Sequence, residues 1–179
     1  GCMFEEYLLT GNKEHLNRLV TLMHDSIENY HELALDYANA YLYDEAGQIL
    51  RIPTNASPLT HYYTGSFLWR QAKEKEALES FNKAENTCSD YCFPNRLEDI
   101  IALEEAILLN PEGARAPYYL GCLYYDKRQY DEALKNWTLS AELDPDFPTV
   151  WRNLALIYCN KEGDTEKALE CMERAFSLD

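Results

Sequence analysis

Residues 114–145 read ARAPYYLGCLYYDKRQYDEALKNWTLSAELDP, and this stretch decides the fold. Its first half places apolar and small residues three or four apart, which is the spacing of one face of a helix. Its second half repeats that spacing and ends at a proline, so a second helix stops there. The stretch therefore predicts two helices that pack through small residues. The positions that define the unit are Leu120, Gly121, Tyr124, Ala133, Trp137 and Pro145.

The same pattern returns along the chain. A second copy follows at 148–178, where the turn between the helices is longer, and weaker copies begin at Pro58 and Ile27. This pattern resembles the tetratricopeptide repeat, which has a period of about 34 residues and the signature W-x2-L-G-x2-Y…A-x3-F…P. The resemblance implies an all-α fold, an α-solenoid (superhelix) of helix-turn-helix repeats that stack on one another. The second copy is carried by Trp151, Leu154, Ala155, Tyr158, Ala168, Met172 and Ala175.

The repeats divide the chain into a single array. Ser57 and Pro58 predict a firm helix start, because serine caps a helix and proline suits its first turn. One stretch exceeds the period, and we interpret it as a loop plus one added helix, begun by Asn95 with Glu98. The predicted ranges are a partial repeat at 1–26, repeats at 27–57 and 58–91, the extra loop and helix at 92–113, and repeats at 114–147 and 148–179.

Both ends of the chain fall inside repeats, so we expect a fragment of a longer protein. Residues 90–97 and 151–155 are also similar to the repeat array of large bacterial proteins that carry a preceding domain of unknown function. This resemblance implies a bacterial source and leaves a carbohydrate-related role open.

Composition limits the partners. The 31 acidic and 16 basic residues give a net charge of −15, which repels the phosphates of nucleic acids. No run of about 18 apolar residues and no signal peptide is visible, so we expect no membrane partner and a cytoplasmic location. The six cysteines and four histidines fit no metal or redox spacing, which predicts no metal site and no cofactor.

A binding surface is predicted on the concave side of the stack. Positions two, five, nine and twelve of each first helix lie beside the packed stripe, and in three copies they are rich in aromatic residues and arginine. Such residues favour recognition, with arginines as anion contacts and aromatic rings as stacking surface. The alternative is that the tyrosines pack against the next repeat and the arginines pair with acidic residues. The candidate groove residues are Tyr62, Trp69, Arg70, Arg115, Tyr118, Tyr125, Arg152 and Asn153.

These features favour a non-catalytic scaffold that binds a peptide segment or partner domain through the groove, including the rest of its own polypeptide. Exposed repeat ends also allow self-association. The alternative is an accessory repeat region of a bacterial carbohydrate-related enzyme, which positions its catalytic domain or contacts glycan. No catalytic arrangement of Ser, Cys, His and acidic residues is apparent, so we do not expect an enzyme.

Overall fold

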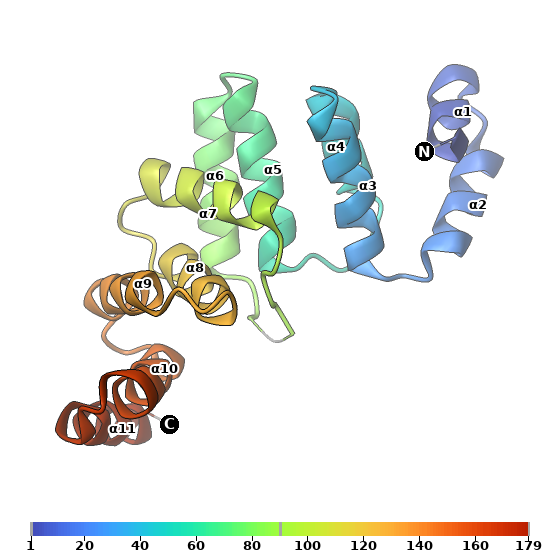
Figure 1. Ribbon diagram of the computed structural model, residues 1–179. Coiled ribbons are helices and arrows are strands. Elements are labelled where there is room, and N and C mark those ends of the chain that lie inside the picture. The colour runs from blue at the N-terminus through green and yellow to red at the C-terminus, as the bar shows by residue number, and fades with distance from the viewer. Residues whose placement is uncertain (1, 90, 179) are drawn as a thin grey trace.

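The computed structural model describes residues 2–89 and 91–178, and within these ranges it contains helices and no strand (Figure 1). The prediction of an all-α fold is confirmed. The helices are α1 (Cys2–Thr10), α2 (Lys13–Met23), α3 (Ile27–Asn39), α4 (Tyr43–Ile49), α5 (Pro58–Arg70), α6 (Glu74–Glu85), α7 (Leu97–Leu109), α8 (Arg115–Asp126), α9 (Tyr130–Leu143), α10 (Pro148–Ile157), the π-helix η1 (Tyr158–Glu162) and α11 (Thr165–Leu178).

The helices pack as consecutive pairs, which are α1 with α2, α3 with α4, α5 with α6, α8 with α9, and α10 with α11. Neighbouring pairs lie side by side in an elongated, curved row, and the termini lie at its opposite ends (Figure 1). The exception is α7, which lies against α5 and against α8 and crosses the direction of α5 (Figure 1). The array is therefore an α-solenoid with one helix inserted between two first helices.

Glycine permits the close approach of the paired helices at two equivalent positions. A Cβ atom added at Gly121 of α8 would lie 2.5 Å from Cδ1 of Trp137 on α9. A Cβ at Gly65 of α5 would overlap the ring of Phe81 on α6. The large aromatic residue of each second helix thus occupies the space that the missing side chain leaves, as the repeat pattern predicts.

The predicted start of α5 is confirmed, whereas the capping residues of α7 differ from the prediction. The Ser57 hydroxyl accepts a hydrogen bond from the backbone N–H of Thr60 at 3.4 Å, and Pro58 is the first residue of the helix. The start of α7 is capped by Asp99 instead of by Asn95 with Glu98, because its carboxylate accepts the backbone N–H groups that precede the helix.

The longer turn of the last repeat is formed by a change of helix type. Helix α10 continues into the π-helix η1, whose wider turn takes up the extra residue. Gly163 then ends it with a φ of +68°, a left-handed conformation that glycine adopts without strain.

The hydrophobic core follows the row of helices. One cluster of buried side chains runs from Phe4 to Leu120, and a second runs from Ala133 to Cys171. Tyr118 and Tyr124 are partly buried against both clusters, so the core is nearly continuous. No described helix is long and apolar enough to cross a membrane.

Candidate interaction surfaces

The predicted groove residues of α5 are largely engaged within the stack. Tyr62 is 0% exposed and donates its hydroxyl to Oε1 of Glu85 at 3.2 Å. Trp69 is half-buried, and exposed Arg70 donates from Nη2 to Oε1 of Glu105 on α7 at 2.8 Å. The prediction that Tyr62 faces an open groove is wrong, because aromatic residues of α6 and α8 pack around its ring.

Arg115 of α8 is also engaged. Its Nη2 lies 3.1 Å from Oδ2 of Asp144, and its guanidinium lies 3.6 Å from the centre of the Phe147 ring. Arg70 is neutralised in the same way by an acidic residue of another helix. The predicted strip of three positive charges is therefore reduced to Arg152, which is exposed and forms no ion pair within residues 2–89 and 91–178.

The remaining predicted residues form what we call the C-terminal face, defined by Tyr118, Tyr125, Arg152 and Asn153 on α8 and α10. Tyr118 and Tyr125 are half-buried, because the first ring packs on Phe147 and the second on Trp137 of α9. Asn153 is half-buried too, and its Nδ2 lies 3.7 Å from Sγ of Cys122. Arg152 is exposed on this face, and the two tyrosines are partly exposed.

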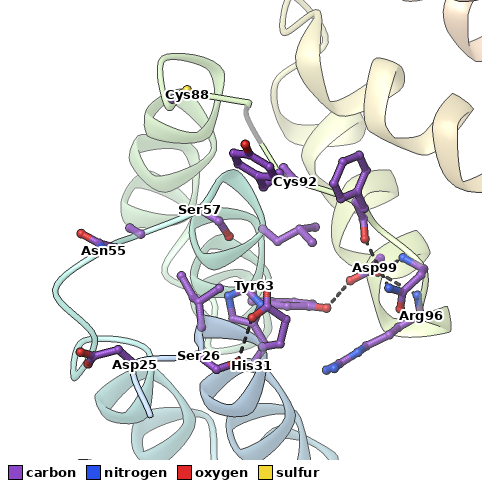
Figure 2. Close-up of a pocket in the computed structure, with 17 residues that line it drawn as sticks. Asp25, Ser26, His31, Asn55, Ser57, Tyr63, Cys88, Cys92, Arg96 and Asp99 are labelled. Carbon is purple, nitrogen blue, oxygen red and sulfur yellow. Dashed lines mark hydrogen bonds between the residues drawn. The ribbon is translucent and has the colours of Figure 1, made fainter. Parts of the chain in front are cut away.

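A second surface, which we call the N-terminal cavity, is an open cavity of about 670 Å³. It is bounded by the start of α3, the connection into α5 and the loop before α7 (Figure 2). The volume lies within the range of about 300–1,000 Å³ that ligand-binding pockets occupy. The lining residues labelled in Figure 2 are Asp25, Ser26, His31, Asn55, Ser57, Tyr63, Cys88, Cys92, Arg96 and Asp99.

His31 forms part of the lining and is held rigidly. Its Nε2 lies 2.8 Å from Oγ1 of Thr60, and its ring meets the ring of Tyr63 edge to face at 5.1 Å between centres. Burial lowers the pKa of His31 to about 4, because the surroundings solvate the imidazolium poorly. The imidazole is therefore neutral near pH 7.

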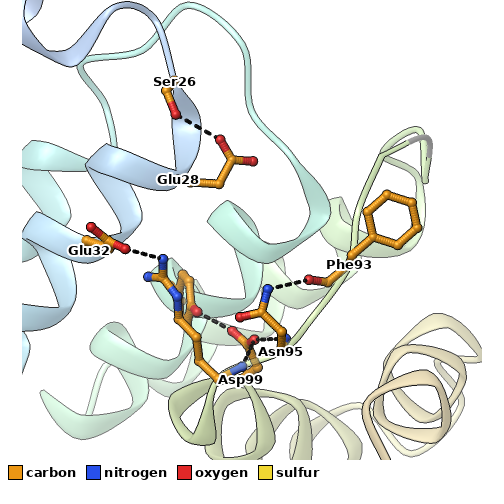
Figure 3. Close-up of polar contacts among 8 residues, drawn as sticks. Ser26, Glu28, Glu32, Phe93, Asn95 and Asp99 are labelled. Atoms are coloured by element: carbon orange, nitrogen blue, oxygen red, sulfur yellow. Dashed lines mark hydrogen bonds and ion pairs between the residues drawn. The ribbon is translucent and has the colours of Figure 1, made fainter. Parts of the chain in front are cut away.

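The wall formed by the loop and α7 is fixed to two other helices (Figure 3). The Asp99 carboxylate is buried and accepts the backbone N–H groups of Asn95 at 2.7 Å and Arg96 at 2.8 Å. It also accepts the hydroxyl of Tyr63 from α5. The Arg96 guanidinium extends to α3, where Nη2 lies 2.8 Å from Oε1 of Glu32. The inserted segment thus bridges α3 and α5.

Part of this cavity has a signal in the sequence. Glu28 and His31 occupy positions two and five of the copy that begins at Ile27, and Leu59 occupies position two of the next copy. All three line the cavity, so it opens on the side predicted to be concave. The loop before α7 gave no such signal, because it lies outside the repeat period and has no repeat position to assign.

Within the described part of the chain, no group of three or more His, Cys, Asp or Glu side chains is placed to share a metal ion. All six cysteines, which lie in the described ranges, are free thiols. The pKa of the Cys92 thiol is raised to about 12 by burial, which makes its reactive thiolate scarce at neutral pH.

Comparison with known families supports the repeat interpretation in the C-terminal part. A family model described as TPR repeat matches residues 121–161, and one described as tetratricopeptide repeat matches residues 148–179.

The chain is also similar, at low identity, to solved structures. A crystal structure of MamA is 19% identical, with a TM-score of 0.47 over 98% of this chain and 93% of that chain. MamA from Desulfovibrio magneticus RS-1 is 18% identical, with a TM-score of 0.42 over 85% and 94% of the two chains. YrrB, described as a TPR protein with an unusual peptide-binding site, is 21% identical, with a TM-score of 0.44 over 93% and 75%.

Proposed function

We propose that the chain is a tetratricopeptide repeat protein and a non-catalytic scaffold, because residues 121–179 match models of that repeat. In this proposal its concave side binds an extended segment of a partner protein. Stacked helical repeats present long concave surfaces of this kind, although the fold alone does not identify the partner.

The observation that carries the proposal is the N-terminal cavity. It combines accessible apolar surface from Ile27 and Phe93 with polar groups such as Ser26, Asn55 and Asn95. A few polar groups in a mixed pocket fix the orientation of a bound group, while the apolar surface contributes most of the binding free energy. The cavity therefore suits a side chain of a docked segment, with its backbone lying across the mouth.

The C-terminal face provides a second contact region for the same segment. Arg152 is exposed, and the adjacent tyrosines offer large rigid surfaces with little loss of side-chain entropy. We propose that Tyr118, Tyr125, Arg152 and Asn153 contact the part of the partner that extends beyond the cavity. Trp69 and Arg70 lie at the end of α5 away from the cavity, and the ion pairs of Arg70 with Glu105 and of Arg115 with Asp144 give these arginines a structural role in this proposal.

Panning an unbiased peptide display library against the whole chain tests the proposal. Ala56 lines the cavity and is exposed, so Ala56→Trp is expected to fill the mouth and remove binding of the enriched peptides. The matched control is Ala40→Trp, which adds the same side chain at an exposed position outside the cavity. Equal binding by both variants and the wild type contradicts the proposal.

Binding of soluble glycans to the wild type and to the same two variants is measured alongside. Saturable glycan binding that Ala56→Trp leaves intact, without any peptide binding, favours the accessory carbohydrate role instead.

A further inference from the structure

The charged groups that line the N-terminal cavity are not balanced. The Arg96 guanidinium is paired with Glu32, and the Asp99 carboxylate is occupied by three donors. Asp25 and Glu28 also line the cavity, and neither forms an ion pair within the described ranges. Two carboxylates at the start of α3 are therefore left without a cationic partner.

These carboxylates are offset only in part, since the Ser26 hydroxyl donates to Oε2 of Glu28 at 3.0 Å and the start of α3, which has no side-chain cap, adds its own partial positive charge. Burial keeps His31 uncharged near pH 7, and no lysine lines the cavity. The positive ends of α5 and α7 are occupied as well, since Ser57 caps the first and Asp99 the second. The whole chain adds a field of the same sign, because its net charge is −15.

The loop at the edge of the cavity carries two exposed aromatic rings. Tyr91 is 90% exposed and Phe93 is 73% exposed, and both belong to the lining. An aromatic face attracts a cation that lies within about 6 Å of the ring centre, and the attraction is stronger for a partly desolvated ligand. The aromatic rings and the carboxylates thus favour the same kind of ligand.

We propose that the N-terminal cavity binds a lysine or arginine side chain of the partner segment, with Asp25 and Glu28 as charge partners and Tyr91 and Phe93 as aromatic contacts. The inference rests on the proposed function and specifies the chemistry of the bound segment. The sequence predicted that arginines of the groove contact an anionic ligand, whereas this inference gives the ligand a positive charge. Two of those arginines, Arg70 and Arg115, are already paired with acidic residues.

The peptide panning described above provides the test, with the amino-acid composition of the enriched peptides as its readout. We expect lysine and arginine to be enriched over the naive library in the peptides that Ala56→Trp no longer binds. The variant Asp25→Asn with Glu28→Gln keeps the size of both side chains, and asparagine tolerates the left-handed backbone of residue 25, where φ is +54°. It should weaken a selected basic peptide by on the order of fivefold at low salt.

The control variant is Glu166→Gln with Glu170→Gln, which removes the same charge from exposed positions of α11 and should leave the affinity unchanged. Cavity-dependent peptides without excess lysine or arginine overturn this inference and leave the proposed function standing. Equal weakening by both double variants also overturns it, since only the net charge would then matter. If no enriched peptide depends on the cavity, the proposed function fails and the inference fails with it.

Discussion

Tyr63 of α5 donates its hydroxyl to the buried carboxylate of Asp99 at the start of α7. This hydrogen bond joins a repeat helix to the inserted helix, and it lies beside the N-terminal cavity (Figure 2). Burial is the main cause that raises the pKa of Tyr63 far above its ordinary value, so the phenol stays protonated and remains a donor.

We predict that Tyr63→Phe destabilises the chain by about 1.5–3 kcal/mol, because a buried carboxylate loses one of its donors. Urea denaturation followed by circular dichroism measures the change in the free energy of unfolding. Tyr91→Phe removes an equivalent hydroxyl from an exposed ring and should change stability by less than about 0.5 kcal/mol. Similar losses for the two variants would show that the bond to Asp99 contributes nothing specific.

The His31 site predicts a pH dependence of stability. Its pKa is lowered to about 4 in the folded chain, against an ordinary value of 6.5. Between these values the unfolded chain binds more protons, so stability rises with pH and falls on acidification. The expected loss from this residue is roughly 2 kcal/mol between pH 7 and pH 5.

Comparing wild type with His31→Gln at each pH isolates this contribution, because the carboxylates titrate in both proteins. Glutamine keeps a polar side chain at this position and carries no titratable proton. Parallel stability profiles for the two proteins would contradict the assigned role of burial.

The sequence predicted the features that depend on neighbouring residues and missed those that depend on contacts between residues far apart in the chain. Helix periodicity and small residues such as Gly121 are local, and they correctly predicted the paired helices and their contacts. The direction of α7 depends on long-range contacts, such as that between Tyr63 and Asp99, which no repeat position encodes. The same limitation applies to Tyr62, whose burial comes from helices that follow it in the chain.

The close contact at Gly121 predicts the effect of one added methyl group. A Cβ there would lie 2.5 Å from the Trp137 ring, so Gly121→Ala should cost about 1–3 kcal/mol despite the better helix propensity of alanine. Gly47 of α4 has no atom within 4 Å of its added Cβ, so Gly47→Ala should stabilise the chain by about 0.5–1 kcal/mol. Thermal and urea unfolding of the two variants should therefore shift in opposite directions, and a shared sign would refute the packing argument.

Two arginines that the sequence treated as equivalent should separate in experiment. Arg115 is half-buried between Asp144 and the Phe147 ring, so Arg115→Gln loses an ion pair and a cation–π contact and should lower stability by about 1–2 kcal/mol. Arg152 is exposed and has no ion-pair partner in the described ranges, so Arg152→Gln should leave the free energy of unfolding within about 0.5 kcal/mol of wild type. If the C-terminal face contacts the partner, Arg152→Gln should instead change the affinity of a selected peptide that spans both surfaces. Measuring the free energy of unfolding and the peptide affinity for both variants separates these roles. A stability loss confined to Arg152→Gln would contradict the structural role assigned to Arg115, because the structural arginine would then lie on α10 instead of α8.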